Sequence, residues 1–230
     1  MVRALGLAFS LLLATPAVAS GPVVVELYTS QACEECPRAN AIAAGLAARP
    51  DVLPLTFPVD YWDYLGWTDT LAKPEFGERQ ASHREALQLR GLQTPQVVIN
   101  GRSTASGLQR RAVVALIRTE AAAAPSRPTA RFTARGRRAS VSDGPAPQGG
   151  AEVWLVRYDP RLVNVHVREG ANRRRSVPHR NVVRELVQLG RWTGTYRSWL
   201  VPPAETAGLE TALLVQAEDS GRVLAAAVAD

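Results

Sequence analysis

The sequence predicts an α/β domain followed by a smaller antiparallel β domain, and two patterns support this prediction. Between residues 20 and 122, β-branched runs alternate with alanine-rich segments of helical periodicity, which is typical of βαβ units. From residue 129 to residue 230, short alternating stretches are separated by turns rich in glycine and proline, which favours antiparallel strands in a sandwich-like arrangement. Residues 123–128 contain two prolines and are predicted to be the linker.

The first domain is predicted to have its elements in the order β-α-β-α-β-β-α. Pro74 favours a helix start, because proline is tolerated in a first turn. Asn100-Gly101 predicts a tight turn between the last two strands. The strands are predicted at residues 23–28, 52–59, 96–99 and 103–106, and the helices at 33–49, 74–89 and 108–122. This order of elements is that of the thioredoxin fold.

The second domain is predicted to consist mainly of short strands. Residues 181–192 fit either a strand or a helix, because Val183, Leu186 and Leu189 also lie at helical spacing. The other strands are predicted at residues 129–135, 138–141, 151–158, 163–167, 197–201, 213–217 and 223–228.

The N-terminus has the features of a secretory signal peptide over residues 1–19. A short positive region ending at Arg3 precedes an apolar run, and Ala17-Val18-Ala19 matches a small-residue cleavage pattern. The run is too short to span a membrane as a mature helix, so no stable membrane insertion is expected after cleavage. The signal and the composition indicate a bacterial protein that is periplasmic or secreted.

Composition indicates a basic globular protein. Of the 230 residues, 46% are hydrophobic, which is enough apolar surface to exclude disorder as the dominant state. The net charge is +6, and Lys73 is the only lysine among 27 basic residues. Arginine suits phosphate recognition, but no nucleic-acid-binding motif accompanies the charge, so no nucleic-acid partner is expected. The run at residues 173–175 is interpreted as a solvated turn and strand edge.

Cys33 and Cys36 are the only two cysteines of the chain. A bridge across so short a loop constrains little of the unfolded chain, which favours a redox-active pair over a structural disulfide. Amides at a helix N-terminus stabilise a thiolate, so Cys33 is predicted to be the nucleophile and Cys36 the resolving thiol. Zinc is not expected, because it needs about four ligands and no second cysteine pair exists.

Two loops are predicted to contact a substrate. Thr94-Pro95 precedes the third strand, where a cis peptide would expose the Thr94 backbone to an extended substrate. The loop after the second strand starts at the same edge of the sheet as the dithiol, so Tyr61 and Trp62 are predicted to line a substrate groove. Packing of these aromatic residues against the second domain is the alternative.

These residues resemble a known family. Cys33-Glu34-Glu35-Cys36-Pro37 together with Thr94-Pro95 resembles the thioredoxin superfamily. Longer strings are similar to an uncharacterised bacterial secreted family of thioredoxin-like proteins, known as a domain of unknown function. They are ELYTSQAC at 26–33, VDYWDYLGW at 59–67, QTPQ at 93–96, NVVR at 181–184 and LGRW at 189–192. The resemblance implies the fold and the dithiol site and supplies no substrate.

The resemblance also suggests a role for Glu26. Thioredoxins place a buried acid near this point of the chain, where it serves as proton acceptor for the resolving thiol. Glu26 on the first strand is therefore predicted to be catalytic. A structural ion pair with an arginine is the alternative interpretation of this carboxylate.

The predicted function is an exported thiol–disulfide oxidoreductase whose redox-active disulfide, Cys33–Cys36, requires no further cofactor and no metal. Its partners would be a protein substrate with a thiol or disulfide and a redox partner that sets the direction of electron flow. Two alternatives stay open. One is a redox-dependent Cu(I) carrier that uses the two thiolates, with His83 as a chemically sensible third ligand. The other is a non-catalytic thioredoxin-like binding module.

Overall fold

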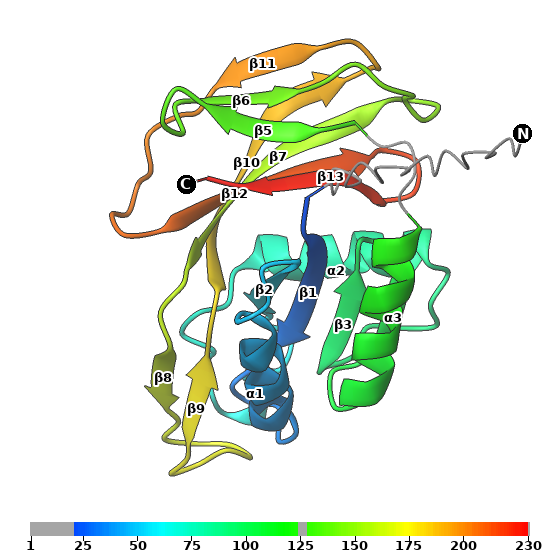
Figure 1. The fold of residues 1–230 in the computed structure, drawn as a ribbon. Helices are drawn as coiled ribbons and strands as arrows, with labels where there is room; N and C mark the ends of the chain where they lie inside the picture. The colour runs from blue at the N-terminus through cyan, green and yellow to red at the C-terminus, as the bar shows by residue number, and fades with distance from the viewer. Residues whose placement is uncertain (1–20, 124–127, 230) are drawn as a thin grey trace, which may run out of the picture.

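A single eight-stranded mixed sheet runs through both halves of the chain (Figure 1), in the order β13-β12-β7-β10-β2-β1-β3-β4. The computed structural model describes residues 21–123 and 128–229. The predicted signal peptide at residues 1–19 and most of the predicted linker lie outside the described residues.

The N-terminal half supplies one end of this sheet. β1 is buried along its whole length and pairs in parallel with β2 and antiparallel with β3. Asn100 and Gly101 have φ values of 48° and 62°, so the turn predicted between β3 and β4 is confirmed. The strands of this half are β1 (Val23–Thr29), β2 (Val52–Pro58), β3 (Gln96–Ile99) and β4 (Ser103–Ser106).

Helices cover both faces of this part of the sheet (Figure 1). Side chains alternate along β1, so Leu27 packs with α1 and α3 while Tyr28 packs with Phe76 of α2 on the opposite face. The helices are α1 (Cys36–Leu46), α2 (Pro74–Ala86) and α3 (Arg110–Ala122), with a short 3₁₀ helix η1 (Asp63–Leu65). In the described part of the chain, no helix is long and apolar enough to cross a membrane.

The first helix begins later than predicted. It starts at Cys36 rather than Cys33, and it ends at Leu46 rather than at residue 49. The segment before it forms turns, in which the Cys33 amide donates to the Ser30 carbonyl and the Cys36 amide donates to the Cys33 carbonyl, both at 3.2 Å. Cys33 therefore lies in the turn that leads into the helix.

The strands of the C-terminal half pack in two layers. One layer is the antiparallel end of the large sheet, and the other is a three-stranded sheet that covers it through a core around Trp192, Val153 and Leu213. The first layer consists of β7 (Ala151–Asp159), β10 (Val182–Trp192), β12 (Glu210–Ala217) and β13 (Val223–Val228). The second consists of β5 (Ala130–Thr133), β6 (Arg138–Val141) and β11 (Arg197–Leu200).

The two halves are joined where β10 meets β2. Val182 pairs with Thr56 in parallel, and the Thr56 amide donates to the Asn181 carbonyl at 2.9 Å. The Asn181 carboxamide donates to the Pro54 carbonyl at 2.8 Å. One apolar core also crosses the junction, since Phe57 and Leu214 belong to the same buried cluster. The halves predicted as two domains therefore share a sheet and a core.

The ambiguous segment at residues 181–192 is a strand. β10 pairs along its length with β7, with two register irregularities, and this long-range pairing decides against a helix. The hairpin formed by β7 and β10 continues outwards as a narrow arm, β8 (Val163–His166) and β9 (Ser176–His179), which lies along α1 (Figure 1). β9 was not predicted from sequence, because its apolar pattern is short and follows three arginines.

Candidate functional site

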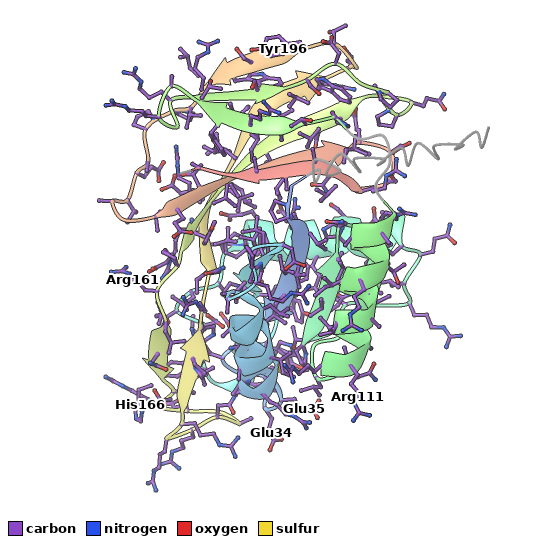
Figure 2. The ribbon with its side chains drawn as sticks, in the orientation of Figure 1. Glu34, Glu35, Arg111, Arg161, His166 and Tyr196 are labelled. Carbon is purple, nitrogen blue, oxygen red and sulfur yellow. A yellow bond between two sulfur atoms is a disulfide. The ribbon has the colours of Figure 1, made fainter. Side chains whose placement is uncertain are left out.

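The cysteine pair forms a disulfide at the start of α1. Cys33 and Cys36 are bonded with their Cα atoms 5.4 Å apart. Pro37 lies in the first turn of the helix, where a missing amide proton is tolerated. Cys33 is 7% exposed and Cys36 is fully buried. The spacer residues Glu34 and Glu35 are exposed and point outwards at one end of the molecule (Figure 2). An attacking sulfur can therefore reach Cys33 more easily than Cys36.

The Thr94–Pro95 peptide is cis, as predicted. Gly107 lies between this proline loop and the dithiol helix, which is α1 beginning at Cys36. The Gly107 amide donates to the Pro95 carbonyl at 3.0 Å. A Cβ atom placed on Gly107 would lie 2.9 Å from the Cβ of Ala39 and 3.1 Å from the Cβ of Pro95. Because Ala39 is in the first turn of α1, the proline loop packs directly beside the start of this helix.

The aromatic loop after β2 contacts the proline loop through Trp62. Its indole Nε1 donates to the Thr94 Oγ1 at 2.6 Å, and its ring stacks with that of Tyr64, which is 77% exposed. Tyr61 instead turns towards α2, where its hydroxyl donates to Gln80 at 3.1 Å. Burial raises the pKa of Tyr61 to about 12, so the phenol stays neutral. Trp62 and Thr94 thus lie together, and the Tyr61 ring lies 6.1 Å from that of Trp62 with its hydroxyl directed to Gln80.

Gln31 ties the aromatic loop to the turn before Cys33. Its side-chain oxygen accepts the Trp67 indole N–H at 2.9 Å, and its backbone amide donates to Asp69 at 2.7 Å. Asp69 is buried, which raises its pKa to about 6 although backbone N–H groups of Gln31 and Leu71 oppose this shift. The roles of Gln31 and Asp69 were not predicted from the sequence, because neither residue type is diagnostic alone.

Asn172, at the tip of the β8–β9 arm, also holds this turn. Its carboxamide nitrogen donates to the carbonyl of Gln31 at 2.9 Å and to the carbonyl of Cys33 at 2.8 Å, and the side chain is fully buried. No sequence signal identified this residue, since it lies 139 positions from Cys33 in an arginine-rich turn. The exposed arginines 173–175 adjoin it, as expected of a solvated turn.

Glu26 is not brought to the disulfide. Its carboxylate forms a bidentate ion pair with Arg79 of α2, at 2.7 Å for both contacts, and also accepts from Tyr28 at 2.7 Å. These partners lie on the α2 face of the sheet, whereas α1 packs on the other face. Burial would raise the pKa of Glu26, but the adjacent Arg79 and His83 side chains outweigh this effect and hold the pKa well below its usual range. The position favours the alternative interpretation, a structural ion pair.

His83 lies with Glu26, with its Nε2 3.2 Å from the carboxylate. Among residues 21–123 and 128–229, no group of three or more His, Cys, Asp or Glu side chains is placed to hold a metal ion. The three residues considered for copper, Cys33, Cys36 and His83, therefore do not form such a group.

These features define a class of protein: a mixed α/β protein with a Cys-X-X-Cys disulfide in the turn before a helix, surrounded by loops from both halves of the chain. The chain belongs to the family described as protein of unknown function DUF1223, which matches residues 24–216. The resemblance to a family of unknown function is thereby confirmed. No curated protein matches the sequence.

Two solved structures are similar to this chain. The crystal structure of protein AGR_C_4864 from Agrobacterium tumefaciens has a TM-score of 0.76 and 28% sequence identity, and the match covers 94% of this chain and 96% of that chain. HBP35 of Porphyromonas gingivalis has a TM-score of 0.50 and 12% identity, covering 90% of this chain and 74% of that chain. The second similarity is one of fold alone.

Proposed function

We propose that this protein is an exported thiol–disulfide oxidoreductase with a thioredoxin-like N-terminal half. The observation that carries the proposal is the Cys33–Cys36 disulfide before α1, in which the first cysteine is the more exposed. The order of elements from β1 to α3 and the cis peptide at Pro95 beside the helix support the thioredoxin-like assignment. Export rests on the predicted signal peptide at residues 1–19.

The proposed reaction is thiol–disulfide exchange. In the oxidising direction, a substrate thiolate attacks the Sγ of Cys33, the bond to Cys36 breaks, and the electron pair leaves with the Cys36 Sγ, which takes up a proton. A second substrate thiolate then attacks the substrate sulfur of this mixed disulfide and releases Cys33 as a thiolate. The substrate loses two electrons and the protein gains them. Reduction of a substrate disulfide follows the same steps in reverse, starting from the Cys33 thiolate.

The surrounding loops suggest how a substrate would lie. Trp62 and Thr94 are hydrogen-bonded to each other, and the proline loop packs beside the first turn of α1. An extended substrate segment would run along the Thr94 backbone, with its cysteine over Cys33 and an apolar neighbour against the Trp62 ring. A protein substrate fits this surface better than a small thiol, because the contacts extend beyond the disulfide.

The test is a redox titration of the purified mature protein in glutathione buffers, with metal analysis of the same sample. We expect a reversible two-electron couple without bound metal. We also expect Cys36→Ser to accumulate mixed disulfides on incubation with a protein disulfide, because the Cys33 thiolate attacks it, releases the other sulfur as a thiol, and has no resolving thiol to reverse the step. Cys33→Ser is the matched control and should accumulate far fewer. A disulfide that stays closed throughout the titration, or stoichiometric copper held by both cysteines, would overturn the proposal.

A further inference from the structure

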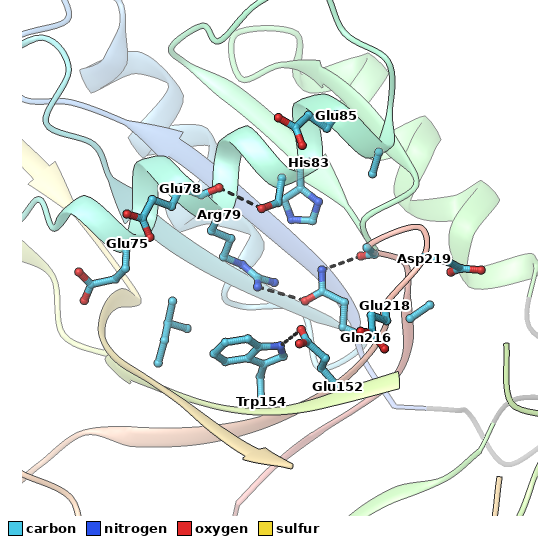
Figure 3. A pocket seen from close by; sticks show the side chains of 15 residues that line it. Glu75, Glu78, Arg79, His83, Glu85, Glu152, Trp154, Gln216, Glu218 and Asp219 are labelled. Carbon is cyan, nitrogen blue, oxygen red and sulfur yellow. Dashed lines mark hydrogen bonds between the residues drawn. The ribbon is translucent and has the colours of Figure 1, made fainter. Parts of the chain in front are cut away.

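A cavity lies between α2 and the C-terminal strands (Figure 3), and its lining residues are distant in sequence from the two cysteines. Its volume is about 790 Å³. Six carboxylates line it in a chain whose net charge is +6. They are Glu75, Glu78 and Glu85 of α2, Glu152 of β7, and Glu218 and Asp219 after β12. Glu75, Glu85 and Glu218 form ion pairs with Lys73, Arg84 and Arg191. Among the described residues, Glu78, Glu152 and Asp219 are the lining carboxylates without an ion pair, so they carry the unbalanced negative charge of the cavity.

The positive charge on the cavity wall is already neutralised. Arg79 donates through Nε and Nη2 to Glu26, and through Nη1 to the side-chain oxygen of Gln216 at 3.1 Å. Its side chain is only 9% exposed. An anion entering the cavity would find each guanidinium nitrogen of Arg79 already donating a hydrogen bond, and it would face the carboxylates around the guanidinium. The wall therefore selects against anionic ligands.

His83 supplies an unused hydrogen-bonding atom at the same wall. The residue is 1% exposed, and its Nδ1 has no hydrogen-bond partner among the described residues. Its Nε2 lies 3.2 Å from the Glu26 carboxylate, and the tautomer that donates from Nε2 leaves Nδ1 as an acceptor. Gly221 has no side chain to cover this atom, and a Cβ there would lie 3.5 Å from it. A buried acceptor without a partner is unfavourable, so a donor from a ligand would satisfy it.

Trp154 adds an aromatic wall next to a carboxylate. Its indole Nε1 donates to Glu152 at 3.0 Å, which fixes the ring and the carboxylate relative to each other (Figure 3). Leu186 and Ala217 extend the apolar part of the lining. A ring face beside a carboxylate attracts an organic cation, and the apolar wall accepts its methylene groups.

We propose that this cavity is a binding site for an organic cation, an ammonium or guanidinium group on an aliphatic chain. The carboxylates of Glu78 and Glu152 would hold the charge, Trp154 would cover the chain, and His83 Nδ1 would accept one N–H. The ligand has two sources with the same chemistry, a free polyamine or a lysine or arginine side chain of a polypeptide. This site does not depend on the dithiol chemistry.

The test is calorimetric titration of the full mature protein at about 0.15 M salt, where exposed charges are largely screened. The probes are spermidine and a capped tripeptide with a central lysine or arginine. We expect saturable binding of at least one probe with one site per chain, weakened about tenfold or more by the Glu78→Gln/Glu152→Gln double variant. Trp154→Leu should also weaken it. The Glu169→Gln/Glu205→Gln double variant removes two exposed carboxylates that do not line the cavity, so it is the charge-matched control and should bind as the wild type does.

A second measurement checks the role of His83. The chain has three histidines, so their ¹⁵N signals can be assigned, and the Nδ1 signal of His83 should shift on saturation while that of exposed His166 does not. Binding of spermidine alone identifies a free polyamine, and binding of the tripeptide alone identifies a polypeptide side chain. Absence of saturable binding by both probes, or equal binding by the double variant and the wild type, would overturn the proposal.

Discussion

Cys33 and Cys36 differ in exposure, and this difference sets their expected reactivity. Cys33 is 7% exposed in the turn, and Cys36 is fully buried in the first turn of α1. We expect iodoacetamide to alkylate Cys33 first in the briefly reduced protein, because only an accessible thiolate reacts quickly. Peptide mass mapping over time measures the order. Equal or faster labelling of Cys36 would reverse the assigned roles.

Gly107 is a tight contact between the proline loop and the dithiol helix. In Gly107→Ala, the new Cβ would lie 2.9 Å from Ala39 Cβ, closer than Cβ atoms approach other side chains in real structures, and a tight 3.2 Å from Leu27 Cδ1. We expect the free energy of unfolding to fall by about 1–3 kcal/mol, as for other overpacked cores, measured by urea denaturation.

Gly45→Ala is the matched control for this substitution. Gly45 lies within α1, and a Cβ there meets nothing within 4 Å. Alanine is the better helix former, so this variant should gain roughly 0.5–1 kcal/mol. If Gly107→Ala were as stable as the wild type, the packing of the proline loop against α1 would be looser than described.

At the scale of elements, the β8–β9 arm connects the C-terminal half to the dithiol turn through Asn172. Asn172→Ala leaves the carbonyls of Gln31 and Cys33 without this donor in a buried position. We expect a loss of about 1–3 kcal/mol in the free energy of unfolding and a changed glutathione equilibrium of the dithiol. Asn164→Ala, on the exposed side of β8, is the control. If the free energy of unfolding and the glutathione equilibrium were both unchanged in Asn172→Ala, the arm would contact α1 without stabilising the turn that contains Cys33.

His179 in β9 makes stability depend on pH. Burial lowers its pKa from about 6.5 to about 4, and Arg184 adds to this, while the bond from the ring to the Val177 carbonyl opposes it. Because the unfolded chain takes up the proton at higher pH, the contribution of neutral His179 is complete above pH 6.5 and is lost as the pH falls towards 4. The loss amounts to about 3 kcal/mol.

Urea denaturation between pH 7 and pH 4 measures this effect in His179→Gln and in the control His166→Gln. Between pH 7 and pH 4, the free energy of unfolding of His166→Gln should fall by about 3 kcal/mol relative to that of His179→Gln. Asp69 also makes stability depend on pH. Its raised pKa stabilises the protein at low pH, and this stabilisation is lost as the pH rises through about 6. Because Asp69 is present in both variants, its effect cancels in the comparison. An identical slope in both variants would contradict the assignment to His179.

For the whole molecule, the shared sheet predicts cooperative unfolding. β10 joins β2, and residues of both halves, such as Phe57 and Leu214, are buried in one cluster. We expect a single calorimetric transition whose calorimetric and van't Hoff enthalpies agree. A fragment ending at residue 123 should not unfold cooperatively, because it exposes the face of the sheet that the C-terminal strands cover. Two separate transitions of the full chain would show that the halves fold independently.

Local patterns were enough to predict most elements and the cysteine pair. The buried run of β1, the proline at the start of α2 and the Asn100-Gly101 turn depend on residues close together in sequence, and all three are found where they were expected. The spacing of Cys33 and Cys36 is local in the same way. Short-range backbone preferences and side-chain periodicity decide such features.

Contacts between distant residues decided the rest. β10 is a strand because it pairs with β7 and β2, and the same segment alone also fits a helix. Glu26 lies away from the disulfide because successive strand residues face opposite sides of the sheet, and α2 brings Arg79 to its side. Asn172 reaches Cys33 across 139 positions because the arm folds back along α1. Sequence periodicity carries no information about which distant side chain completes a buried hydrogen bond, so only the tertiary structure identifies these partners.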